Sequence, residues 1–354
     1  MFAAACEGSS GTTSLGDAGT GGDGTTADVS PGGTDAAHDA SPEAAPDAGD
    51  TGAQAQTPTC IGAAGEDAGT ICSTASCIDD NWAQWPMPNS AAEVAGGAPN
   101  SATYTVHGDG TVTDDVTGLT WQQAPPSSPV TLADATSYCA TLVLGGHADW
   151  RLPTYIELVS IVDLSQVTPS LDRTAFPSGS PADGWASTLL ASDLTSAWEV
   201  YFTVGDSSQD PVDTTNNLRC VRGPDAAPLP AVPPARYAIA AGEVRDTKTG
   251  LTWKQDVSAS TFAWADAKTY CTSLSDGGVA WRLPTMKELV TLVDVTRVAP
   301  PTIDCEAFPA ASGTAAWSAS SFLAVPSYAW AVDFHGGYAI SLDPSVSLGV
   351  RCVR

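Results

Sequence analysis

Hydrophobic and polar positions follow the same order twice along this chain. In residues 151–158 and again in 282–289, an Arg-Leu-Pro-Thr-x-x-Glu-Leu pattern runs into an apolar stretch. Proline favours an extended residue before it, and Thr-x-x-Glu ahead of an apolar run is a helix capping box. The pattern predicts short helices over 154–163 and 285–294. The capping residues are Thr154, Glu157, Thr285 and Glu288. A role for either glutamate as a catalytic acid is less favoured, because a Glu at this position normally bonds the cap residue's N–H.

Other elements recur in the same order. Apolar residues at helical spacing predict helices within 132–142 and 264–274. Alternating residues around Gly-containing turns predict strands near 104–122 and 244–254, and each copy ends in a short strand that contains a cysteine. Each copy therefore reads as strands, a helix, the capped helix and further strands that contain tryptophan. This order predicts an α+β fold.

The two copies align at an offset of 132 residues, which relates Cys139 to Cys271. Each copy spans about 120 residues, which is enough to hold a hydrophobic core of its own. The aromatic segment 82–89 is expected to pack on the first copy. The predicted organisation is a tether (1–58), a Cys-rich connecting segment (59–99), the first repeat (100–222), a Pro-rich linker (223–235) and the second repeat (236–354).

Charge is unevenly distributed in this 354-residue chain of net charge −26. Residues 1–81 contain 13 Asp or Glu and no Lys or Arg. Residues 1–58 are rich in Gly, Ala and Asp and have too few apolar side chains to offset the entropy of ordering, so we expect a disordered tether. Such acidity disfavours nucleic-acid binding and long-range attraction to anionic membranes. No apolar run is long enough for a membrane-spanning helix.

Cysteine usage indicates an oxidising compartment. Small residues precede Cys6 as at a bacterial lipoprotein processing site, which predicts a lipid anchor there; an ordinary N-terminus that happens to contain a cysteine is the alternative. Of the nine cysteines, eight remain once Cys6 is set aside, an even number that suits disulfides. We therefore expect an extracytoplasmic protein, either a cell-surface or outer-membrane lipoprotein or a secreted one.

The symmetry of the copies makes pairing within each repeat the simplest disulfide assignment. It joins Cys139 to Cys220 and Cys271 to Cys352. Cys305 has no counterpart in the first copy, so we expect it to pair with one of Cys60, Cys72 and Cys77. A zinc site in that Cys-rich segment is less favoured, because no histidine lies nearby to complete the ligand set.

These motifs together resemble a known bacterial family. Thr-Gly-Leu-Thr-Trp, the Tyr-Cys helix, Trp-Arg-Leu-Pro-Thr-x-x-Glu-Leu and the terminal Arg-Cys-Val-Arg, present in both copies, are similar to the DUF1566 family, also called the Lcl C-terminal domain family. The resemblance implies a surface or secreted domain, often on lipoproteins. In the collagen-like adhesin that gives the family its name, it implies binding to sulfated glycans.

A more distant resemblance is to C-type-lectin-like domains, in which a helix with a Trp-x-x-Ala-x-x-x-Cys pattern is bonded to the last strand. Residues 264–271 fit that pattern, with Cys352 as the partner. The resemblance implies two tandem C-type-lectin-like domains after the tether. The Glu-Pro-Asn and Trp-Asn-Asp ligand motifs of calcium-dependent lectins are absent, so calcium-dependent sugar binding does not follow.

Candidate binding residues are aromatic and basic. The tryptophans Trp185, Trp198, Trp317 and Trp330 either line a sugar-stacking groove or belong to the core, and equivalent aromatics in two copies favour the core. The arginines are expected to form ion pairs with Asp or Glu; they are Arg151, Arg219, Arg222, Arg282, Arg351 and Arg354. Calcium ligation is the alternative to ordinary turn formation for a set of aspartates: Asp109, Asp114, Asp115 and Asp246.

No catalytic constellation is readable, and the residues predict no cofactor. The four histidines are His38, His107, His147 and His335, and none is matched by a histidine in the other copy. The sequence predicts a non-enzymatic protein that binds a glycan or an extracellular protein and meets the membrane only through a lipid anchor. A structural envelope component without a discrete ligand is the alternative. A weaker one is an enzyme of the formylglycine-generating type, which requires two free thiols. The ligand and oligomeric state are left open.

Overall fold

The computed structural model describes residues 82–177, 183–223, 236–276, 278–309 and 315–354, which all belong to one compact unit. The predictions for the tether, Cys6, Cys60, Cys72 and Cys77 lie outside these residues. No helix in the described ranges is long and apolar enough to cross a membrane.

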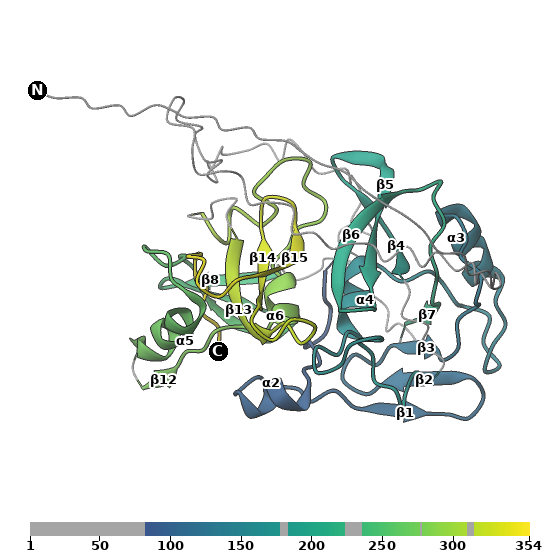
Figure 1. Cartoon of the computed structure of the whole chain (residues 1–354), viewed down its shortest axis with the longest axis horizontal. Coiled ribbons are helices and arrows are strands. Elements are labelled where there is room, and N and C mark those ends of the chain that lie inside the picture. Colours follow the sequence, from purple (N-terminus) through teal and green to yellow (C-terminus); the bar gives the residue numbers. More distant parts are fainter. Residues whose placement is uncertain (1–81, 178–182, 224–235, 277, 310–314) are drawn as a thin grey trace, which may run out of the picture. The chain divides into compact units, whose positions relative to one another are not determined.

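The first repeat contains two antiparallel sheets and two helices (Figure 1). Its four-stranded sheet has the order β1-β2-β3-β7, and its three-stranded sheet has the order β4-β5-β6. The elements are β1 (Tyr104–Val106), β2 (Thr111–Asp114), β3 (Thr120–Gln122), α3 (Leu132–Thr141), α4 (Tyr155–Ser160), β4 (Asp183–Leu190), β5 (Asp193–Tyr201), β6 (Asp206–Pro211) and β7 (Val221–Arg222).

The second repeat has a similar arrangement, except that its closing segment forms isolated bridges through Val353 instead of a fourth strand. Its sheets have the orders β10-β9-β8 and β13-β14-β15, and a small hairpin pairs β11 with β12. The elements are β8 (Tyr237–Ala240), β9 (Glu243–Asp246), β10 (Thr252–Lys254), α5 (Trp264–Ser273), β11 (Ser275–Asp276), β12 (Val279–Ala280), α6 (Met286–Val290), β13 (Ala315–Ser321), β14 (Ala329–Asp333) and β15 (Tyr338–Leu342). The predicted α+β class and internal duplication are confirmed; the C-type-lectin likeness stays a prediction.

The capped helices are shorter than predicted. They end at Ser160 and Val290 instead of continuing to 163 and 294. The hydroxyl of Ser160 donates to the carbonyl of Glu157 at 2.7 Å, and that of Thr291 donates to the carbonyl of Glu288 at 2.6 Å. Such side-chain bonds to the backbone compete with continued helix formation.

The main hydrophobic core is shared by both repeats, which corrects the expectation of two self-sufficient cores. One continuous cluster includes Trp198 and Phe202 from the first repeat together with Trp330 and Phe334 from the second. Two smaller clusters surround the Cys139 and Cys271 disulfides. Alternation along β5 and β14 turns bulky side chains of both repeats toward one common interior. Either repeat alone would expose that face to water.

Polar groups connect the repeats at the edge of this core. The Ser207 hydroxyl accepts hydrogen bonds from the Tyr155 hydroxyl at 3.0 Å and from the Ala339 N–H at 3.3 Å. The Lys287 ammonium group is buried and donates to the carbonyls of Ser160 at 3.2 Å and Val162 at 2.8 Å. These bonds fix α6 against the C-terminal end of α4.

The segment before the first repeat also bonds to the second repeat, which the sequence did not predict. The guanidinium of Arg236 lies 5.3 Å from the ring centroid of Trp82, and the side chains of Asn89 and Thr285 are hydrogen-bonded at 2.9 Å. The short helix α2 (Ala91–Ala95) follows. Its position is set by tertiary partners in the second repeat, which local sequence does not reveal.

Candidate functional site

The four candidate tryptophans are core residues. Trp185, Trp198, Trp317 and Trp330 are each no more than 1% exposed, so none offers a ring face to a sugar. The indole N–H of Trp185 donates to the carbonyl of Val130, and that of Trp317 donates to the carbonyl of Phe262, both at 2.9 Å. Their burial corrects the stacking-groove hypothesis and agrees with the core interpretation.

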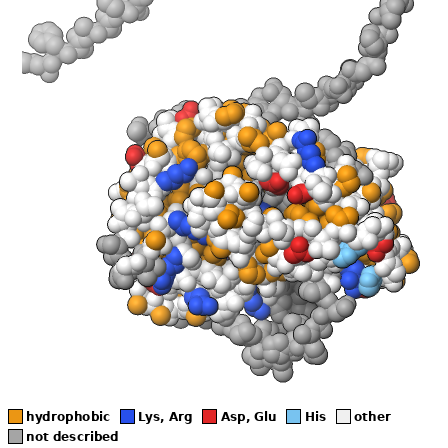
Figure 2. Space-filling model, turned by 90° about the horizontal axis from the view of Figure 1, so that it is seen from below, with side chains coloured by type: hydrophobic (Ala, Val, Ile, Leu, Met, Phe, Trp, Pro, Cys, Tyr) orange, Lys and Arg blue, Asp and Glu red, His pale blue; other side chains and the backbone are white. Residues whose placement is uncertain are grey.

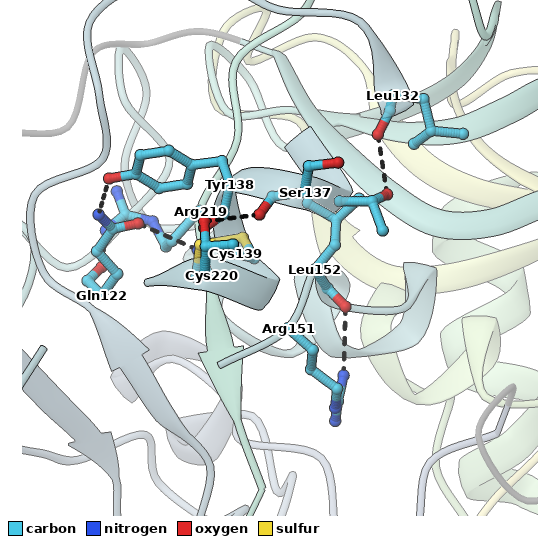
Figure 3. Close-up of a disulfide and its surroundings, with 11 residues drawn as sticks. Gln122, Leu132, Ser137, Tyr138, Cys139, Arg151, Leu152, Arg219 and Cys220 are labelled. Carbon is cyan, nitrogen blue, oxygen red and sulfur yellow. Dashed lines mark hydrogen bonds between the residues drawn. A yellow bond between two sulfur atoms is a disulfide. The ribbon is translucent and has the colours of Figure 1, made fainter. Parts of the chain in front are cut away.

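Each repeat contains the predicted internal disulfide. Cys139 bonds Cys220 and Cys271 bonds Cys352, both with Cα–Cα distances of 5.5 Å and a sequence separation of 81 residues. Beside the first disulfide, Gln122 donates to the Tyr138 hydroxyl at 3.1 Å and accepts from the N–H of Cys220 at 3.3 Å (Figure 3). The first helix is thus tied to the closing strand both covalently and by polar bonds.

Both capping-box glutamates are fully engaged in structure. Glu157 accepts from the N–H of Thr154 at 2.8 Å and from Arg151 at 2.7 Å. Glu288 accepts from the N–H of Thr285 at 2.9 Å and binds Arg282 through two hydrogen bonds of 2.7 Å. A carboxylate held by a cap and a guanidinium is poorly placed to transfer protons.

Two arginines differ from the expected ion pairing. Arg219 is buried and donates to the carbonyls of Gln122 at 2.6 Å and Gln123 at 2.7 Å, with its guanidinium 4.7 Å from the Phe176 centroid. Arg351 is also buried, 5.0 Å from the Phe308 centroid. Burial lowers the pKa of each guanidinium to about 10. Arg222 and Arg354 form the expected ion pairs, with Asp149 and Glu243 respectively.

Basic residues distinguish the sheet β10-β9-β8: Arg245 and Arg354 are exposed, and Lys254 is half-buried. Val244 and Trp253 face the core, so Arg245 and Lys254 occupy the opposite, outer face of β9 and β10. The Lys254 ammonium and the Arg354 guanidinium lie 4.6 and 5.1 Å from the ring of Trp281. We call Arg245, Lys254 and Arg354 the basic sheet face.

The first repeat lacks this feature. The positions equivalent to Arg245 and Lys254 are Thr113 and Gln122, as the matching registers of the two sheets show. Charged side chains are sparse on the surface seen from below, and the Lys and Arg side chains there are separated by neutral ones (Figure 2). The two repeats therefore present different charge on the same scaffold.

The family comparison agrees with the repeated geometry. The family model described as the Lcl C-terminal domain matches residues 110–222 and 242–354. The chain belongs to the Lcl C-terminal domain family. No curated protein matches this chain. The resemblance drawn from the sequence motifs is confirmed, in two tandem Lcl C-terminal domains.

The aspartates considered for calcium form turns in both Lcl C-terminal domains. Asp114 accepts from the N–H groups of Val116 and Thr117, and Asp246 accepts from those of Lys248 and Thr249. Asp109 bonds Thr111, and Asp115 bonds Thr105. Ordinary turn formation accounts for Asp109, Asp114 and Asp246, and the contact with the Thr105 hydroxyl accounts for Asp115. No cluster of three or more potential metal ligands occurs in the described part of the chain.

The described cysteines are all in disulfides. Besides the two pairs above, Cys305 is disulfide-bonded. The prediction that its partner is Cys60, Cys72 or Cys77 concerns residues outside the described ranges. The pair of free thiols that a formylglycine-generating enzyme needs is therefore not found among the described residues. Disulfides in both Lcl C-terminal domains are typical of an extracytoplasmic protein.

A cavity of about 250 Å³ lies where the two Lcl C-terminal domains meet. The first domain contributes Trp198, and the second contributes Asp294, Arg297, His335 and Tyr338. Sequence reasoning missed this cavity, because residues from both repeats form it and Arg297 has no arginine counterpart in the first copy. The sequence signal that could have indicated the cavity is a charged residue present in only one of the two copies.

Proposed function

We propose that this protein is a non-enzymatic recognition protein, on the cell surface or secreted, and that its second Lcl C-terminal domain binds an anionic glycan. The observation that carries the proposal is the basic sheet face, which occurs on a chain of net charge −26. Arginine and lysine beside aromatic rings suit sulfate or carboxylate groups on a sugar polymer. The first domain, with Thr113 and Gln122 at the equivalent positions, serves as support.

Rigidity supports a binding role for this surface. Cys352 precedes Arg354 and is bonded to Cys271, and Arg354 is also held by Glu243. Basic groups fixed in this way lose less conformational entropy on binding than groups on flexible loops.

Binding of the full-length protein to dextran sulfate, compared with neutral dextran, tests the proposal. We expect the full-length protein to bind only the sulfated polymer, and increasing NaCl to weaken binding, because Arg245 and Arg354 are exposed and salt screens their charges. The double variant Arg245→Thr/Lys254→Gln copies the first domain and should bind about 5-fold more weakly or less. Lys268→Gln, a basic residue on α5, is the matched control and should leave binding unchanged.

The converse substitution sharpens the test. Thr113→Arg gives the first domain one residue of the basic sheet face and should strengthen binding. If the wild-type protein binds neither polymer, the glycan proposal is wrong. The hydrophobic core that the two domains share would then favour the structural envelope role.

A further inference from the structure

Asp294 and Arg297 bring opposite charges to the lining of the cavity between the two domains. The guanidinium Nε of Arg297 is buried and has no hydrogen-bond partner among the described residues, and the same holds for the indole Nε1 of Trp198. Both atoms have almost no accessible surface, so a ligand in the cavity would meet the charged parts of its lining and not these two donors.

In the equivalent loop of the first domain, both carboxylate oxygens of the aspartate accept hydrogen bonds from the loop itself. There Asp163 accepts from the N–H of Ser165 at 2.9 Å through one carboxylate oxygen and from the amide of Gln166 at 2.7 Å through the other. Asp294 likewise accepts from the N–H of Thr296 at 3.0 Å. Within the described ranges, however, its second oxygen receives no bond from Arg297, the residue at the Gln166 position.

An acid and a base three residues apart thus line one cavity without pairing to each other. Burial raises the pKa of Asp294, and the charge of nearby Arg297 lowers it. An ion pair between them would relieve the cost of holding both charges away from water. Two opposite charges left separate in this way are complementary to a ligand that carries one charge of each sign.

The rest of the lining combines apolar and aromatic residues with the polar side chains of Ser192, Gln209, Thr302 and His335. Leu190 from the first domain and Val298, Pro300 and Tyr338 from the second surround the charged end. The volume of about 250 Å³ admits a molecule of amino-acid size rather than a polymer. We propose that this cavity binds a small zwitterion, an α-amino acid with an apolar side chain, whose carboxylate is held by Arg297 and whose ammonium group is held by Asp294.

Calorimetric titration of the full-length protein with L-phenylalanine tests this proposal. Phenylalaninamide lacks the carboxylate and N-acetylphenylalanine lacks the ammonium group, so each should bind about 10-fold more weakly or less. Glycine, which lacks the apolar side chain, should also bind more weakly. Failure of phenylalanine to bind at millimolar concentration, or equal binding of phenylalanine and its amide, overturns the proposal.

Substitutions test which residue of the cavity binds the carboxylate of phenylalanine. Arg297→Gln, which copies the first domain, should weaken phenylalanine binding about 10-fold and abolish the preference for phenylalanine over its amide. Asp163→Asn in the first domain is the matched control and should bind like the wild type. Retained preference in Arg297→Gln, with a native circular dichroism spectrum, contradicts the assignment. The site is separate from the basic sheet face, so Arg245→Thr/Lys254→Gln should bind phenylalanine normally.

Discussion

The two Lcl C-terminal domains contain the same internal bonds in different surroundings. The Arg151–Glu157 and Arg282–Glu288 pairs have nearly identical geometry, yet the side chain of Arg151 is 46% exposed and that of Arg282 only 17%. The preceding segment accounts for part of this difference, because Gly97 lies beside Arg282 and Glu93 accepts from Ser320 at 2.7 Å. Duplication has preserved what holds each domain together, while the contacts around each copy have diverged.

The contact between the domains shows the same divergence. The first domain has Ile156 where the second has Lys287, and only the lysine can donate hydrogen bonds across the interface. The ammonium group is placed at the end of α4, where the last carbonyls of a helix favour a cation. The two domains are therefore not interchangeable in position.

Removal of a disulfide is the strongest perturbation. The double variants Cys139→Ser/Cys220→Ser and Cys271→Ser/Cys352→Ser each release a loop of 81 residues. We expect each to lower the free energy of unfolding by about 4.5 kcal/mol on the chain-entropy estimate. Guanidinium unfolding followed by tryptophan fluorescence measures both.

The shape of the transition tests the shared core. Because Trp198 and Trp330 belong to one cluster, loss of either disulfide should shift a single cooperative transition. Two separate transitions, with only one shifted in each variant, would show that the domains fold independently.

Substitution of each capping-box glutamate compares the partly exposed Arg–Glu pair of the first domain with the largely buried pair of the second. Glu288→Gln breaks a pair in which both side chains are largely buried, and we expect a loss of about 3 kcal/mol in the free energy of unfolding. Glu157→Gln should cost about 1 kcal/mol, because solvent screens the partly exposed Arg151. Urea unfolding of both variants gives the difference. Equal losses would show that the covering segment has no energetic effect.

Short sequence motifs predicted the structural features that depend on neighbouring residues or that occur in both repeats. The capping boxes, the paired Cys139 and Cys220 and the order of elements follow from short motifs whose chemistry is independent of distant residues. The contacts of Lys287 and of segment 82–89 could not be predicted, because their partners lie in other parts of the chain. The charged cavity was hidden for the same reason: the unpaired state of Arg297 is a property of the folded loop.

A pH profile gives the smallest expected effect and concerns a position that differs between the domains. Burial raises the pKa of Asp206 from 3.8 to about 6, and its counterpart at the start of β15 is Tyr338, which has no carboxyl group.

A carboxyl whose folded-state pKa is raised stabilises the fold while it is protonated, and this contribution is lost as pH rises from 4 through 6. Asp206 keeps some contact with solvent, so we expect the free energy of unfolding to fall by about 1–2 kcal/mol between pH 4 and pH 7 on its account. Burial also raises the pKa of Asp114 and Asp294, so these two residues add to the fall in the free energy of unfolding with increasing pH. Urea unfolding of the wild type and of Asp206→Asn across this range isolates the contribution of Asp206. The difference between the two proteins should change with pH in this direction, and a constant difference would show that Asp206 titrates normally in the folded protein.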